Sequence, residues 1–171
     1  MILPAVRDPR LVSIKRGGTL TEADHRLLAV WAATCAEHVL PLFEESNGGD
    51  SRPRDAIEAA RAWARGEAKM MDTRAIGGHA MGAARPLQGA ARFAAYAAGQ
   101  AACVAHVPEH DLGAAAYAIK AVQAAAQRGT EKGAGLAERD WQRQQIPGGL
   151  YNLVLEDQAR RNGICWSVFS D

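Results

Sequence analysis

The sequence predicts an all-α fold: a single-domain multi-helix bundle of about six or seven helices, preceded by a short N-terminal β-like arm. Alanine makes up about a fifth of the 171 residues and aromatic residues only 6%, and alanine loses the least conformational entropy on entering a helix. Apolar residues recur three or four positions apart through most of the chain, as on one face of a helix. A chain of this length can bury one substantial core, so residues 1–171 are expected to form a single domain.

An extended arm is expected at residues 1–20, where the pattern is not helical. Its segment "RLVSIKRGGTL" is β-like and turns at Gly17 and Gly18, because glycine tolerates positive φ. The helical body is then expected over residues 21–171. Thr21 is placed to cap its first helix, with acidic residues directly after it where the helix dipole favours them.

The first helix has one face that should be buried. That face carries Leu27, Trp31, Cys35, His38 and Leu42. Pro41 has no N–H and crowds the preceding turn, so the helix should kink or end near it. The large side chains expected to be largely buried across the fold are Trp31, Leu42, Trp63, Tyr117 and Trp141.

Proline and glycine divide the rest of the chain into further helices. The segments expected to be helical are "RDAIEAARAWARG" after Pro53, "RAIGGHAMGAAR" from about Asp72, residues 87–106, residues 108–129, "GLAERDWQRQQ" and "LYNLVLEDQARRNG". The second of these contains three glycines and should be a weak helix. An apolar tail, "ICWSVF", follows the last helix.

Composition excludes several classes of partner. Twenty basic and nineteen acidic residues give a formal charge of +1, so no global field attracts nucleic acid or an anionic membrane. We expect no membrane span and no secretory signal, because the apolar runs are short and alanine-rich. Three widely spaced cysteines, Cys35, Cys103 and Cys165, favour buried, reduced thiols in a cytoplasmic protein over disulfides.

One short motif suggests catalytic chemistry. His106, Glu109 and His110 form HxxEH, the signature of a class of zinc protease in which both histidines lie on one helical face. Pro108 lies between the two histidines and should form a corner between helices, which removes the geometry that the motif needs. No recognisable third ligand follows, so we expect no metal and no cofactor.

A histidine cluster of His79, His106 and His110 is retained as an alternative ligand or metal site. The expected hairpin at Pro86 does not by itself bring His79 to the other two, so only a specific packing of the next helix could do so. No nucleophile elbow or Walker motif is present, and the basic segments mix both charge signs, which argues against nucleic-acid binding.

Five segments carry a likeness to a known family: "RDPRLVSIKRGGTLTEADHRLLAVWAATCAEHVLPLFEE", "RPRDAIEAARAWARGE", "AHVPEHDLGAAAYAIKAV", "AERDWQRQQIP" and "RRNGICWSVF". In these segments the chain resembles the Imm-5-like family of bacterial immunity proteins. Members are small, alanine-rich helical proteins assigned by gene neighbourhood to polymorphic toxin systems. The resemblance implies an intracellular antidote that binds and blocks a cognate toxin, and it supplies no catalytic residues. The glycine-rich "AIGGHAMGAARP" departs from the alanine-based helix expected there.

A partner surface is expected on the first interhelical loop, because loops on a rigid scaffold can vary without disturbing the core. Its charged residues are Glu44, Glu45, Asp50 and Arg52. Two other classes stay open. One is a small-ligand or metal-binding enzyme that uses the histidine cluster, and the other is a helical oligomerisation module, including a homodimer.

Overall fold

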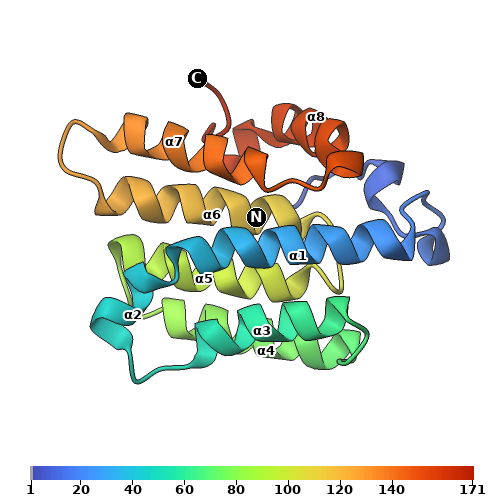
Figure 1. The fold of residues 1–171 in the computed structure, drawn as a ribbon, viewed down its shortest axis with the longest axis horizontal. Helices are drawn as coiled ribbons and strands as arrows, with labels where there is room; N and C mark the ends of the chain where they lie inside the picture. The colour runs from blue at the N-terminus through green and yellow to red at the C-terminus, as the bar shows by residue number, and fades with distance from the viewer. Residues whose placement is uncertain (1) are drawn as a thin grey trace.

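The computed structural model describes residues 2–171, and within them the chain folds as one all-α domain with no β-strand (Figure 1). Eight α-helices form in that range: α1 Glu22–Val39, α2 Pro41–Asn47, α3 Arg52–Ala64, α4 Met70–Ala84, α5 Gly89–Cys103, α6 His110–Ala125, α7 Glu131–Gln144 and α8 Tyr151–Arg161. The predicted fold class is therefore confirmed. The helix count exceeds the expected six or seven partly because Pro41 begins a separate short helix.

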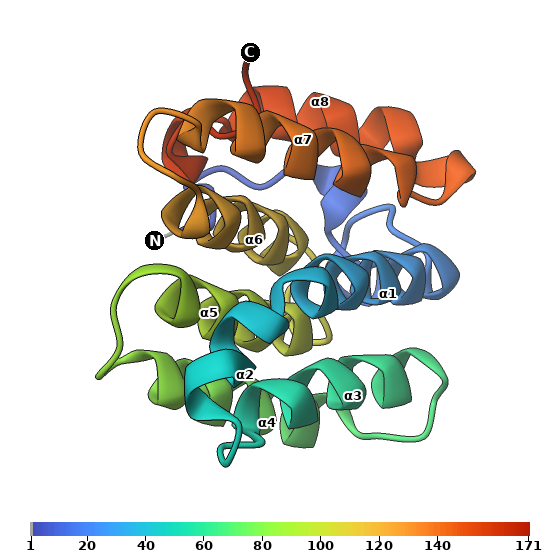
Figure 2. The same ribbon diagram turned by 60° about the vertical axis from the view of Figure 1, so that its left-hand side comes forward.

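The helices stack in layers, with α3 and α4 at one side and α7 and α8 at the other (Figures 1 and 2). Helix α5 lies near the centre and packs against α1, α2, α3, α4 and α6. Most of its buried residues are alanine, and it also buries Gly99, Gln100 and Cys103. Small side chains let five neighbouring helices approach one central helix closely, and this explains the alanine-rich composition.

Helix α1 begins and ends at the residues that the sequence indicated. The Thr21 hydroxyl accepts a hydrogen bond from the backbone N–H of Asp24 at 3.1 Å, which caps the first turn. The helix stops at Val39, and α2 starts at Pro41 with a change of direction of 48°. Proline fits the first turn of a helix because the N–H it lacks has no partner there.

The N-terminal arm differs from its prediction. In place of a β-like run, residues 2–20 contain two 3-10 turns, Pro9–Leu11 and Ile14–Arg16, and a single isolated bridge between Ser13 and Leu20. The segment is anchored by the buried side chains of Ile2, Leu11 and Leu20. The apolar residues of this segment therefore pack onto the helical body rather than pair as strands.

The glycines of α4 are explained by its contact with α5. A Cβ atom on Gly77 would lie 2.8 Å from the carbonyl oxygen of Gly99 and 3.1 Å from the sulfur of Cys103. The two backbones thus meet without intervening side chains, and any larger residue would push them apart. Gly78 on the same helix has nothing within 4 Å of its Cβ position, so it has no such role.

Burial of the large side chains follows the prediction in part. Trp31 is 1% exposed, whereas Leu42, Trp63, Tyr117 and Trp141 are only partly buried. Leu27 was expected inside and is 42% exposed, because Leu28 takes the inward position one residue later. His38 also lies on the exposed side of the predicted face.

Within residues 2–171 no single helix is both long and apolar enough to cross a membrane. The bent pair α1 and α2 meets these two criteria only when its helices are taken together, and half of the residues of α1 are buried in the core of the domain.

Candidate functional site

Two of the acids predicted to form a partner surface are paired with arginines at the start of α3. The Glu44 carboxylate accepts two hydrogen bonds from Arg54, at 2.9 and 2.7 Å, and Asp50 pairs with Arg52 at 2.6 Å. The hydrogen bonds between Asp50 and Arg52 hold the pKa of Asp50 below its usual value and raise the pKa of Arg52. Glu45 is exposed and forms no ion pair with the residues that the structure describes. Of the four residues predicted to lie in one loop, only Asp50 does, because Glu44 and Glu45 belong to α2 and Arg52 begins α3. Glu45 is the one acid of this set without an ion pair among the described residues.

The three predicted histidines do not form a metal centre. Across residues 2–171 no group of three or more His, Cys, Asp or Glu side chains is arranged to hold a metal ion. His79 is exposed on α4, and the Nδ1 of His110 bonds the side-chain oxygen of Gln100 at 2.7 Å. Val107 and Pro108 separate α5 from α6, so the HxxEH motif is a corner between helices, as its proline predicted.

The environment of His110 favours a neutral ring. Burial, with the positive charges of His106, Arg161 and Arg74, lowers the pKa of His110 to about 4. Burial also lowers the pKa of His106, whose Nδ1 is buried without a hydrogen-bond partner among the described residues. Both side chains are thus parts of the packing at the α5–α6 corner.

A buried ionic network ties α8 to the start of α6. The Arg161 guanidinium, 1% exposed, donates to Asp157 at 2.9 Å, to Asp111 at 3.1 Å and to the backbone carbonyl of Glu109 at 2.7 Å. The Glu109 carboxylate in turn accepts from Arg7 at 2.8 Å. Burial and the nearby Asp157 raise the pKa of Asp111 to about 7, against the opposing effect of Arg161. This network fixes α8, and with it the C-terminal turn that follows.

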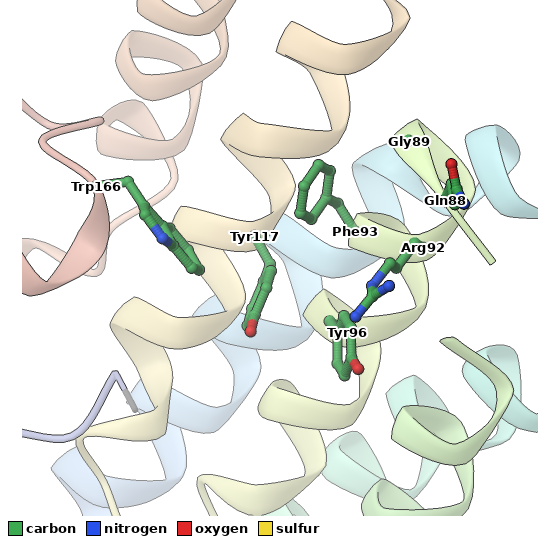
Figure 3. A pocket seen from close by; sticks show the side chains of 7 residues that line it. All are labelled: Gln88, Gly89, Arg92, Phe93, Tyr96, Tyr117 and Trp166. Atoms are coloured by element: carbon green, nitrogen blue, oxygen red, sulfur yellow. The ribbon is translucent and has the colours of Figure 1, made fainter. Parts of the chain in front are cut away.

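An aromatic cleft lies between α5, α6 and the C-terminal turn Gly163–Cys165 (Figure 3). It encloses about 480 Å³ and is lined by Gln88, Gly89, Arg92, Phe93, Tyr96, Tyr117 and Trp166. Tyr117 lies at its centre, with ring centroids 5.1 Å from Tyr96 and 5.0 Å from Trp166. The cleft offers flat aromatic faces and one guanidinium, which suit binding more than bond breaking.

Two cations lie over rings of this aromatic cleft: Arg92, which lines it, and Lys120, which lies beside it over Phe93. The Arg92 guanidinium is 5.5 Å from the centroid of Tyr96, and the Lys120 ammonium is 5.7 Å from the centroid of Phe93. Such distances allow a cation–π attraction. Burial and the neighbouring Tyr96 raise the pKa of the Tyr117 hydroxyl, so it stays protonated at neutral pH. The cleft is therefore aromatic and cationic at the same time.

Trp166 reaches the cleft because the backbone there is left-handed. Its φ is 57° and that of Ser167 is also 57°, a region that non-glycine residues rarely adopt. Asn162 holds the turn: its carbonyl accepts from Ser167 N–H at 2.8 Å and its side chain from Phe169 N–H at 3.0 Å. The turn leaves Trp166 46% exposed.

Sequence reasoning did not identify the aromatic cleft. Phe93 and Tyr96 are three positions apart on one helix, next to Arg92, which is a usable signal for an aromatic face. Trp166 was assigned only to an apolar tail, and nothing in the local pattern says that this tail returns to Tyr117.

Comparison with known proteins gave one result. A family model described as "Imm-5 like putative immunity protein" matches residues 18–148, which include most of the cleft and exclude Trp166. Searches of the curated proteins and of the solved structures found no match.

Proposed function

Because the chain belongs to the Imm-5-like family of immunity proteins, we propose that it binds and neutralises a cognate bacterial toxin in the cytoplasm. The family match over residues 18–148 is the observation that carries this proposal. In this proposal the action is stoichiometric binding to a toxin protein encoded nearby in a polymorphic toxin system, with no chemistry on a substrate.

The surface chemistry supports binding rather than catalysis. The aromatic cleft is lined by aromatic rings, a glutamine, a glycine and an arginine, with no nucleophile beside a general base. The three cysteines are buried and free, which is compatible with a reducing compartment.

We place part of the toxin contact around the connection between α2 and α3, at Glu44 and Glu45 on α2, Asp50 in the connection and Arg52 at the start of α3. Charged residues at the rim of an interface mainly set the encounter rate and the choice of partner. Glu44 and Asp50 are already paired within the chain, so Glu45 is the acid most available to a partner.

Co-expression with the toxin from the adjacent gene tests the function. Survival of the cells together with a complex that co-purifies supports the proposal. Survival without any complex indicates instead an enzyme that reverses the damage, and the absence of both contradicts immunity against that toxin.

The loop contact is tested separately by Glu45→Lys. This change should weaken protection while leaving helicity and thermal unfolding unchanged. The matched control is Asp72→Lys, which makes the same charge reversal at an exposed residue in the first turn of α4. Equal effects of the two variants would contradict a contact at the loop.

A further inference from the structure

We propose that the aromatic cleft receives an acidic segment of the toxin, one in which a carboxylate side chain lies next to an apolar or aromatic one. This inference rests on the proposed function and names the chemistry of the partner. Three features of the cleft support it. The cleft is rich in aromatic side chains, and its cations form no ion pair with the described part of the chain. The backbone turn that presents Trp166 is fixed by hydrogen bonds to Asn162.

Aromatic side chains are concentrated here out of proportion to their number. The chain has four Trp, three Tyr and three Phe, and four of these ten rings line the cleft. Trp166 is 46% exposed, whereas Trp31 in the core is 1% exposed. Tyrosine, tryptophan and arginine are the residues most enriched at the energetic centres of protein interfaces.

The positive charge of the cleft has no partner within the described part of the chain. Arg92 donates only to the Leu87 carbonyl, at 3.4 Å, and neither it nor Lys120 forms an ion pair there. Many other arginines are matched, as Arg61 is with Glu37 at 2.7 Å, and what distinguishes Arg92 from the remaining unpaired ones is its position over an aromatic ring of the cleft. An unmatched pair of cations beside aromatic faces is complementary to a carboxylate.

The turn that presents Trp166 is held in place before any partner arrives. Two successive residues with positive φ cost about 1–3 kcal/mol each, and Asn162 and the buried Cys165 and Phe169 fix them in that state. A side chain that is already ordered loses less entropy on binding. The turn thus keeps the Trp166 side chain exposed and in a fixed position.

A protein segment fits these features better than a nucleic acid. The cleft volume of about 480 Å³ accommodates a few side chains, and the net charge of +1 provides no extended field for a phosphate backbone. Trp166 is the lining residue that the C-terminal turn contributes to the cleft. We therefore assign this turn to partner contact within the cleft.

A capped pentapeptide with the sequence Asp-Glu-Tyr-Asp-Leu probes this proposal on the full-length protein. Binding is followed by ¹H–¹⁵N spectra, in which the indole signal of Trp166 is assigned through its loss in Trp166→Phe. The acidic peptide should shift this signal in a saturable way, and the shift should weaken with salt. The isosteric peptide Asn-Gln-Tyr-Asn-Leu should bind at least tenfold more weakly, because charge-assisted hydrogen bonds are the stronger ones.

Variants of the chain assign the effect to the cleft. Arg92→Gln combined with Lys120→Gln should reduce the affinity for the acidic peptide at least tenfold. Arg85→Gln combined with Arg128→Gln is the matched control, since both arginines are exposed and neither lies over an aromatic ring of the cleft. Any one of three results would overturn the proposal. The two peptides could bind with equal affinity, the two double variants could lose affinity for the acidic peptide equally, or an oligothymidine could bind more tightly than the acidic peptide.

A measurement of how well the chain protects cells from the toxin distinguishes the proposed role of the cleft from the proposed immunity function. If Trp166→Ala remains folded and fully protective, the cleft is not the toxin contact, although immunity itself stands. If the peptide binds as described and the native chain protects against no neighbouring toxin, immunity fails while the acidic specificity of the cleft stands.

Discussion

His38 on α1 and Glu138 on α7 share a hydrogen bond of 2.8 Å between the imidazole Nδ1 and a carboxylate oxygen. The Glu138 side chain is 3% exposed, whereas that of His38 is 43% exposed. The second carboxylate oxygen of Glu138 accepts from Gln142 at 2.9 Å, and the His38 ring stacks on Trp141 at 3.6 Å. This pair thus joins the first helix to the seventh.

Removing His38 should leave the buried carboxylate with one partner fewer. We expect His38→Ala to reduce the free energy of unfolding by about 1–3 kcal/mol, the cost of an unsatisfied buried group. Urea unfolding measures this change. Addition of Glu138→Gln to His38→Ala should recover part of the loss, and strictly additive effects of the two changes would contradict the coupling.

Two neighbouring glycines of α4 should respond in opposite directions to alanine. Gly77→Ala should destabilise the fold by about 1–3 kcal/mol, because its methyl group meets the α5 backbone at Gly99. Gly78→Ala has open space and should stabilise the helix by up to about 1 kcal/mol. Thermal unfolding of both variants tests the packing, and a loss of equal size in both would contradict it.

The depressed pKa of His110 predicts a loss of stability on acidification. The unfolded residue gains its proton near pH 6.5, while the folded one stays neutral until about pH 4. The contribution of His110 is therefore complete above pH 6.5 and is lost as the pH falls toward 4. Its full size is about 3 kcal/mol at 1.36 kcal/mol for each pKa unit.

The effect of His110 must be separated from that of Asp111, whose pKa is raised to about 7 and which therefore stabilises the fold on acidification over the same pH range. Subtracting the unfolding free energy of a His110 variant from that of wild type makes this separation. His110→Asn retains a donor for Gln100 and cannot titrate. The difference in unfolding free energy between wild type and this variant should shrink from pH 7 to pH 4. Parallel pH profiles for the two proteins would show that His110 does not titrate as its surroundings require.

The three cysteines should be unreactive in the folded protein. Burial raises the pKa of Cys35 and Cys103, and raises that of Cys165 to about 11. At pH 8 a thiol reagent such as dithionitrobenzoate should titrate none of them, and all three in urea. Ser46→Cys, at an exposed position of α2, is the positive control. Rapid reaction of a native thiol in the folded protein would contradict this burial.

Local signals predicted much of the fold. Thr21, Pro41 and Pro108 mark helix boundaries because capping and the missing proline N–H act within one turn. The register of α1 was harder, since Leu27 and Leu28 are adjacent apolar residues and only packing against other helices selects Leu28. The position of the N-terminal segment likewise depends on contacts with distant parts of the chain, such as that of Arg7 with Glu109.

The candidate site was much less predictable, because it depends on contacts between residues far apart in the chain. Tyr117 and Trp166 meet through the return of the C-terminal turn, which the Arg161 network fixes in space. The pairing of Glu44 with Arg54 also requires the bend between α2 and α3. Neither relationship has a periodic signature in the sequence.

The proposed function requires that this chain bind a toxin in a fixed ratio. The most direct test is a titration of the purified toxin from the adjacent gene with purified protein, while the activity of the toxin is measured. The proposed function predicts a linear fall in activity that reaches zero at one equivalent. Complete inactivation at a small fraction of an equivalent, or full activity at a tenfold excess, would contradict it.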